Sequence, residues 1–138
     1  MLKFIRKGVS MLLVKTEVRE SDIAGVGLFF LEDIKKGQEV WRFDNQIDRS
    51  LSDLEVEALP EIFKEYLEKY AYIDLETGLW VLCGDNGRFV NHSKNPNVIS
   101  VVSELFTMDI AKRDIKAGEE YTADYSEWDS KFDPALYK

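Results

Sequence analysis

The chain has 138 residues and a formal net charge of −8, a length typical of one domain with a single core. No apolar run approaches the ~18 residues that span a membrane, so we expect no membrane association. The negative charge argues against direct nucleic-acid binding, because phosphates attract clusters of Lys and Arg. It suits a basic partner, although an acidic face is equally well explained as a solvated surface that maintains solubility.

The first residues and the cysteine content bear on the compartment. Residues 1–10 are partly basic but have neither a sustained apolar segment nor a small-residue cleavage site, so we predict no secretory signal and a cytoplasmic location. We expect residues 1–11 to be a loose extension, since Met11 is an alternative start. Cys83 is the single cysteine, which excludes an internal disulfide and a cysteine-based zinc cluster. Its apolar neighbours predict a buried, inert thiol.

The first part of the chain is predicted to form short strands joined by turns. Branched apolar residues indicate a strand over 11–18, a turn over 21–25 and a second strand over 26–31. The sequence at 33–39 recurs at 114–120, which we interpret as two equivalent β-turns. Each has a glycine, Gly37 or Gly118, at a position that needs positive φ, and each leads into a strand.

A helical segment is predicted from about residue 51 to residue 70. Ser52 and Glu55 form a capping box, and Pro60 fits the first turn of a second helix. Five apolar residues then recur at three- and four-residue spacing, which predicts an amphipathic stripe packed on the core. They are Ile62, Phe63, Tyr66, Leu67 and Tyr70.

Further strands are predicted on both sides of one strongly polar stretch. Residues 72–74 and 79–83 indicate a hairpin, and two apolar segments at 98–103 and 105–111 indicate two more strands. Between them, residues 88–97 read Arg-Phe-Val-Asn-His-Ser-Lys-Asn-Pro-Asn, which by itself predicts a strand end at 88–90 followed by a turn. A single histidine beside Asn and Ser is more often structural than a base or a metal ligand, so both readings of His92 stay open.

Three blocks in this order resemble the SET domain of protein-lysine methyltransferases. They are Gly-Val-Gly at 25–27, the stretch at 88–97, and Gly-Glu-Glu-Tyr-Thr-Ala-Asp-Tyr at 118–125. The middle block matches the family pattern at every fixed position, and the last differs in Tyr121, where the family usually has Leu. The resemblance covers roughly residues 12–130 and is closest to compact bacterial members without zinc-binding flanking segments.

The resemblance implies a fold that pattern alone would not predict. We expect a mainly β SET-domain fold of several small, β-clip-like sheets, with a short helical insert at about 51–70. The two C-terminal motifs would form a pseudoknot, which is rare among folds. Residues 131–138 would then be a C-terminal tail.

The resemblance also implies a site for S-adenosyl-L-methionine, with S-adenosyl-L-homocysteine as the product. Tyr125 corresponds to the catalytic tyrosine, and the main chain at 25–27 would approach the methionine end of the cofactor. Asn91 would hold the amino acid portion, and Trp128 would cover the adenine in place of a zinc segment. The cofactor-binding candidates are Gly25, Val26, Gly27, Arg88, Asn91, His92, Tyr125 and Trp128.

The substrate channel implied by the resemblance contains Tyr125, Ala123 and Tyr72, which is also a candidate catalytic tyrosine, with Tyr70 as its competitor. The family commonly has Phe or Tyr at the position of Ala123, where the ring limits room for added methyl groups. Alanine therefore predicts a wider channel and leaves the degree of methylation open.

Two functional hypotheses follow from these residues. The first is an S-adenosylmethionine-dependent protein-lysine N-methyltransferase that acts on a basic or lysine-bearing protein. The alternative is a catalytically weak or inactive SET-like module that binds a basic peptide. A metal hydrolase that uses His92 with Asp85 and Asp124 lacks a sufficient ligand set, so we predict no metal site.

Overall fold

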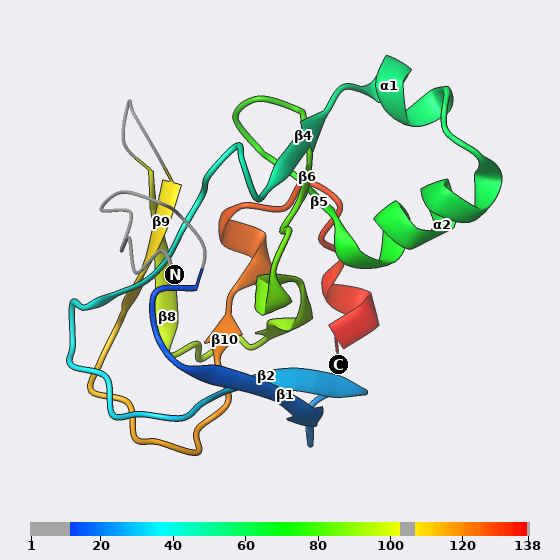
Figure 1. Cartoon of the computed structure of the whole chain (residues 1–138). Helices are drawn as coiled ribbons and strands as arrows, with labels where there is room; N and C mark the ends of the chain where they lie inside the picture. The colour runs from blue at the N-terminus through cyan, green and yellow to red at the C-terminus, as the bar shows by residue number, and fades with distance from the viewer. Residues whose placement is uncertain (1–11, 103–106, 138) are drawn as a thin grey trace, which may run out of the picture.

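The computed structural model describes residues 12–102 and 107–137 (Figure 1). The predicted extension at 1–11 and the predicted strand ends at 103–106 lie outside these described residues. In the described part, four small sheets of two or three strands confirm the predicted mainly β class. The strands are β1 (Thr16–Glu20), β2 (Val26–Phe30), β3 (Glu39–Arg42), β4 (Arg49–Leu51), β5 (Tyr72–Ile73), β6 (Trp80–Leu82), β7 (Asn91–His92), β8 (Val98–Val102), β9 (Thr107–Ala111) and β10 (Thr122–Ala123). The helices are α1 (Asp53–Glu57) and α2 (Glu61–Tyr70), with 3-10 turns η1 (Asn86–Phe89), η2 (Tyr125–Glu127) and η3 (Pro134–Tyr137).

The chain begins with an antiparallel hairpin. β1 pairs with β2 so that Val18 faces Leu28, and the turn between them contains Gly25 with φ of 47°. β1 starts later than predicted because the preceding residues pair elsewhere: Leu13 donates its N–H to the carbonyl of Val40 at 2.9 Å. None of the helices in the described ranges is long and apolar enough to cross a membrane.

The two repeated turns bind each other. Ile34 and Ile115 exchange backbone hydrogen bonds of 2.8 and 2.9 Å, and both side chains are buried. Gly37 and Gly118 have φ of 84° and 94°, so the predicted need for positive φ is confirmed at both positions. The repeat in the sequence therefore becomes a reciprocal contact that joins the start and the end of the domain.

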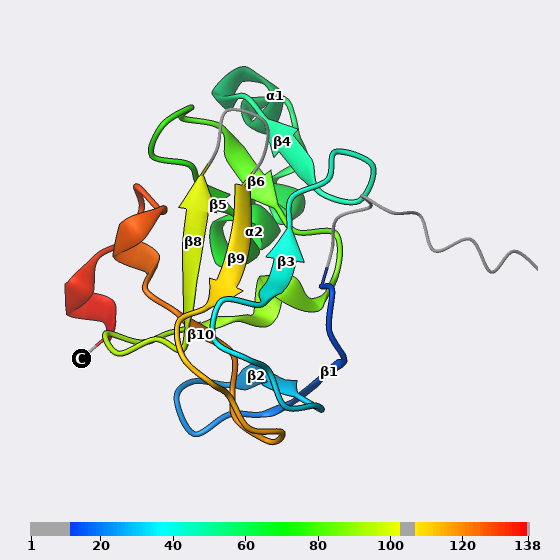
Figure 2. The same cartoon turned by 90° about the vertical axis from the view of Figure 1, so that its left-hand side faces the viewer.

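The main core lies where the hairpin, the paired turns and the largest sheet meet. β9 is the central strand of the antiparallel sheet β3-β9-β8, and Figure 2 shows its three strands side by side above the β1–β2 hairpin. The buried cluster consists of Leu28, Phe30, Ile34, Val40, Val98, Ala111, Ile115 and Tyr121. Burial of these side chains from four distant segments fixes the relative positions of the two C-terminal motifs.

The helical insert lies at the opposite end of the molecule from β1 and β2 (Figures 1 and 2). Its predicted cap is confirmed, since the Ser52 hydroxyl accepts from the N–H of Glu55 at 3.2 Å. The predicted core stripe is wrong in part. Leu67 is fully buried against Trp80, but Ile62 and Phe63 are 78% and 43% exposed. The narrow sheet β4-β6-β5 covers only one side of α2.

Residues 88–90 are not the predicted strand end. Arg88 and Phe89 belong to the 3-10 turn η1, and Val90 is its extended C-cap, because the Asp85 carboxylate accepts from the N–H of Gly87 at 2.9 Å and so caps a helical turn. The predicted hairpin at 72–83 is confirmed by the antiparallel pairing of β5 with β6. The predicted pair of strands after residue 97 is likewise confirmed, since β8 pairs with β9.

Candidate functional site

The two C-terminal motifs meet as a short parallel pair. Asn91 lies opposite Thr122 and His92 lies opposite Ala123 in the pairing of β7 with β10. The N–H of Ser93 extends this pairing to the carbonyl of Ala123 at 3.0 Å. Residues separated by about thirty positions in the chain are thereby brought to one place.

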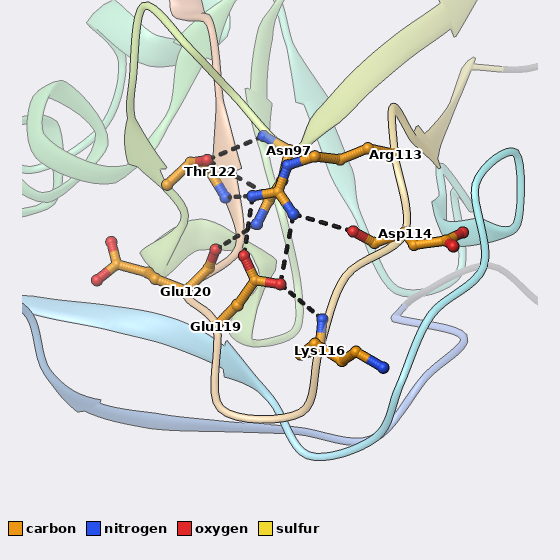
Figure 3. Close-up of polar contacts among 7 residues, drawn as sticks. All are labelled: Asn97, Arg113, Asp114, Lys116, Glu119, Glu120 and Thr122. Atoms are coloured by element: carbon orange, nitrogen blue, oxygen red, sulfur yellow. Dashed lines mark hydrogen bonds and ion pairs between the residues drawn. The ribbon is translucent and has the colours of Figure 1, made fainter.

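Asn97, at the end of the polar stretch, fastens the two motifs together (Figure 3). Its side-chain carbonyl accepts from the N–H of Thr122 at 3.0 Å, and its amide donates to the carbonyl of Glu120 at 2.7 Å. Its own N–H donates to the Thr122 hydroxyl at 3.1 Å. Asn97 is only 3% exposed, so these bonds satisfy polar groups that have little access to water.

A second polar cluster supports the loop before β10. The Glu119 carboxylate accepts from Arg113 at 2.8 Å and from the N–H of Lys116 at 2.6 Å (Figure 3). The hydrogen bond from Arg113 lowers the pKa of Glu119 below its usual value. The side chains of Asn97 and Glu119 therefore both hold the loop that leads to Tyr125.

A pocket of about 320 Å³ opens beside this crossing. Five of the predicted site residues border it: Tyr72, Arg88, Ala123, Tyr125 and Trp128. Tyr70 also borders it, so the choice between Tyr70 and Tyr72 as channel tyrosine stays a prediction. The Trp128 ring lies 4.6 Å from the ring of Tyr72 and 5.0 Å from that of Tyr125, measured between centroids. The wall around Tyr125 is thus largely aromatic.

The Tyr125 hydroxyl donates to the backbone carbonyl of Val90. This bond spans the two motifs and orients the phenol. A phenol that donates its hydrogen in this way can still accept a hydrogen bond through its oxygen lone pairs. Tyr125 and Val90 both border the pocket, which is the geometry that a positioning hydroxyl requires.

The predicted Gly25–Gly27 segment and Asn91 form a neighbouring cluster that does not border this pocket. The Asn91 amide lies within 3.1 to 3.2 Å of the carbonyls of Ala24 and Val26, the Ser21 hydroxyl and the Glu120 carboxylate. A Cβ at Gly27 would lie 2.8 Å from the Glu120 carboxyl carbon. A side chain at this position would therefore force the Glu120 carboxylate to move.

His92 connects this cluster to the pocket. Its ring is buried and its Nδ1 accepts from the N–H of Tyr125 at 3.1 Å. The ring also packs 4.7 Å from that of Phe132. This geometry fits a structural and backbone-binding role. No group of three or more potential metal ligands occurs among the residues that the structure describes.

Arg88 and Cys83 also border the pocket, with different chemistry. The buried Nε of Arg88 has no hydrogen-bond partner among the described residues, so it is a candidate donor to an anionic ligand. Burial raises the pKa of the Cys83 thiol well above its usual value, which fits the predicted inert thiol. Burial also raises the pKa of Tyr72, so this phenol keeps its proton at neutral pH.

Sequence reasoning missed several pocket residues. Phe132 packs on His92 although it follows the predicted domain end, and Lys131 donates to the carbonyl of Ala71 at 2.7 Å. Asp109 and Ser100 border the pocket from β9 and β8. The one sequence feature that points to Asp109 is Tyr121, which departs from the family pattern. In the structure the Tyr121 hydroxyl donates to Asp109 at 2.5 Å.

Comparisons with known proteins agree with this arrangement. The chain is similar to part of a chain in the structure of a humanized mutant of the Chaetomium thermophilum Polycomb Repressive Complex 2 bound to an inhibitor. That likeness has a TM-score of 0.65 and 24% identity over 91% of this chain and 18% of the other. It shows the fold, which is that of SET methyltransferases.

The sequence matches the SET domain over residues 25–126, and the chain therefore belongs to the SET domain family. It is 34% identical over 124 residues to the histone-lysine N-methyltransferase mes-2 of Caenorhabditis elegans. It is 30% identical over 122 residues to a variant-silencing SET domain-containing protein of Plasmodium falciparum. The matches cover 84% and 80% of this chain but only 16% and 5% of those much longer proteins.

Proposed function

We propose that this protein is an S-adenosyl-L-methionine-dependent protein-lysine N-methyltransferase. The observation that carries the proposal is the position of Tyr125. Its hydroxyl is fixed by the carbonyl of Val90 where the two SET motifs cross, and it borders an aromatic pocket. Relatives named histone-lysine methyltransferases support the same class of reaction.

The reaction requires a neutral amine in line with the methyl group that the cofactor supplies. Free lysine has a pKa near ~10.4, so in water at neutral pH only about one amine in a thousand is ready to attack. The aromatic wall of Tyr70, Tyr72 and Trp128 lowers the local polarity beside Tyr125 and so favours the uncharged form of the amine. The Tyr125 oxygen and nearby carbonyl oxygens align the polarised methyl through weak C–H···O contacts.

The residues present fit the cofactor. The unpartnered Nε of Arg88 suits a carboxylate, and Trp128 presents a half-buried aromatic surface to the same pocket. On this proposal the segment at 25–27 and Asn91 hold the amino acid end, and His92 supports the adenine side through its backbone. These assignments follow the family pattern.

The proposed substrate is a basic or lysine-bearing protein. The net charge of −8 favours such a partner electrostatically, and no nucleic-acid contact is needed for the reaction. We further propose that the protein acts in the cytoplasm.

The first experiment is isothermal titration of the protein with S-adenosyl-L-methionine and, separately, with S-adenosyl-L-homocysteine. Micromolar binding of either supports the cofactor site and justifies a search for methylated lysines with labelled cofactor in cell extract. If neither binds, alone or with a lysine-rich peptide present, the enzyme proposal fails. Peptide binding without cofactor binding would instead favour the non-catalytic module.

A further inference from the structure

The pocket contains a carboxylate that the proposed mechanism does not use. Asp109 lies in the central strand β9 and borders the pocket. It accepts from the Tyr121 hydroxyl at 2.5 Å and from the Ser100 hydroxyl at 2.7 Å. Both donors are neutral. Desolvation raises the pKa of Asp109 to about 6, so the group is mostly ionised at neutral pH.

The negative charge of Asp109 has no cationic partner within the described part of the chain. None of the ion pairs there includes it. None of the three basic residues of the pocket wall forms an ion pair with Asp109: Lys131 binds the carbonyls of Glu68 and Ala71, Lys69 lies 5.2 Å from the Tyr70 ring, and Arg88 lies 5.2 Å from the Phe89 ring. Four other ionisable groups interact electrostatically with Asp109. They are Glu127, Tyr72, Cys83 and Tyr121. A desolvated carboxylate normally has a cation beside it.

Ala123 connects this carboxylate to Tyr125. Tyr121, Ala123 and Tyr125 alternate along the chain and all border the pocket. The middle residue has only a methyl group and is 4% exposed. Because all of these residues border one pocket, a ring at position 123 would take up space that Tyr125 and Asp109 share. The small side chain therefore leaves the space beside Tyr125 continuous with the acidic end.

We propose that Asp109, Ser100 and Tyr121 form an acidic recess, continuous with the amine channel past Ala123, that binds the substrate amine as its alkylammonium cation. The proposal deepens the proposed function and rests on it for the identity of the substrate. Because a lysine arrives almost entirely as the ammonium form, the recess supplies the counter-ion on entry. Methylated lysines are also cations and fit the same recess.

The test uses n-butylammonium as a mimic of the lysine side chain and n-pentanol as a neutral control, without cofactor. Binding is followed by NMR of the side-chain carboxyl carbons, with the Asp109 signal assigned from Asp109→Asn. In the wild type, n-butylammonium is expected to bind and to lower the pKa of Asp109, because a cation favours the ionised form. The alcohol is expected to leave this pKa unchanged.

Variants separate the recess from general charge. Asp109→Asn should weaken n-butylammonium binding by about tenfold or more. Glu127→Gln removes an exposed carboxylate at the same pocket and should change the affinity by less than about twofold. Equal affinity in wild type and Asp109→Asn, or equal effects of the alcohol and the ammonium, would overturn the proposal.

The outcome is distinguishable from that of the proposed function. If Asp109→Asn does not fold, the Asp109 carboxyl signal is assigned through bonds from its own backbone in the wild type, and the wild-type titration then decides whether the ammonium shifts the Asp109 pKa. Charge-dependent ammonium binding together with no cofactor binding would keep the recess and reject the enzyme. Cofactor binding without an effect of n-butylammonium on Asp109 would keep the enzyme proposal and reject the recess.

Discussion

Asn97 and Thr122 bind each other through both backbone and side chain, although 25 positions separate them in the chain. The two residues are 3% and 9% exposed. Asn97 also holds the carbonyl of Glu120. One asparagine therefore joins the polar stretch at 88–97 to the segment that ends in Tyr125.

Replacing this asparagine should destabilise the whole domain. Asn97→Ala leaves the N–H of Thr122 and the carbonyl of Glu120 without their partner, at a cost of about 2 to 4 kcal/mol in the free energy of unfolding. Urea denaturation measures the change. Asn95→Ala, the same substitution at an exposed position nearby, should cost less than about 0.5 kcal/mol. Similar costs for the two variants would contradict the role given to Asn97.

Tyr125→Phe should remove methyl transfer while the fold persists. The variant loses the hydroxyl that Val90 orients, so the rate should fall by about a hundredfold or more, with a stability loss of about 1 kcal/mol. Labelled-methyl transfer and thermal unfolding measure the two effects. Tyr66→Phe removes a hydroxyl that lies outside the pocket and should keep the rate. Full activity in Tyr125→Phe would reject the assigned role.

Asn91→Ala should weaken cofactor binding. Its amide positions the carbonyls of Ala24 and Val26, and its loss should lower the affinity for S-adenosyl-L-homocysteine by about tenfold. Calorimetry measures this directly. Asn86→Ala, at an exposed position in η1, is the matched control. An unchanged dissociation constant in Asn91→Ala would show that the cofactor site lies elsewhere.

Ala123→Phe should reduce the number of methyl groups added to one lysine. The ring fills space beside Tyr125 that the alanine leaves open, so a methylated amine has less room to turn. Mass spectrometry of the methylated product gives the distribution of mono-, di- and trimethyl-lysine. A distribution identical to that of the wild type would contradict the wider channel.

Asp109 should make stability fall as the pH rises. Its pKa is about 6 in the folded protein against its ordinary value of 3.8, so between these values the folded state binds more protons than the unfolded state. This term removes about 2 to 3 kcal/mol from the free energy of unfolding between about pH 4 and pH 7. As the pH rises through that window, the free energy of unfolding of Asp109→Asn should increase relative to that of the wild type. A constant difference in urea denaturation across the window would argue against the raised pKa.

The local features were predictable because neighbouring residues determine them. The glycines of the two repeated turns, the Ser52 cap and the pairing of β5 with β6 depend on residues within a few positions of one another. The pattern at 88–90 predicts a strand end, but the Asp85 cap places Arg88 and Phe89 in η1.

The sequence by itself determined the family, since three blocks of varied polar residues in one order identify a SET domain. Only the tertiary structure decided which distant side chains meet. The apolar stripe on α2 was predicted to pack on the core, but the narrow sheet beside it leaves Ile62 exposed. Asp109 and Ser100 are ordinary strand residues in sequence, and their place at the pocket depends on how β8 and β9 pair beneath Tyr121. Periodicity reports which face of an element is apolar, whereas the partner of that face is set by packing between segments far apart in the chain.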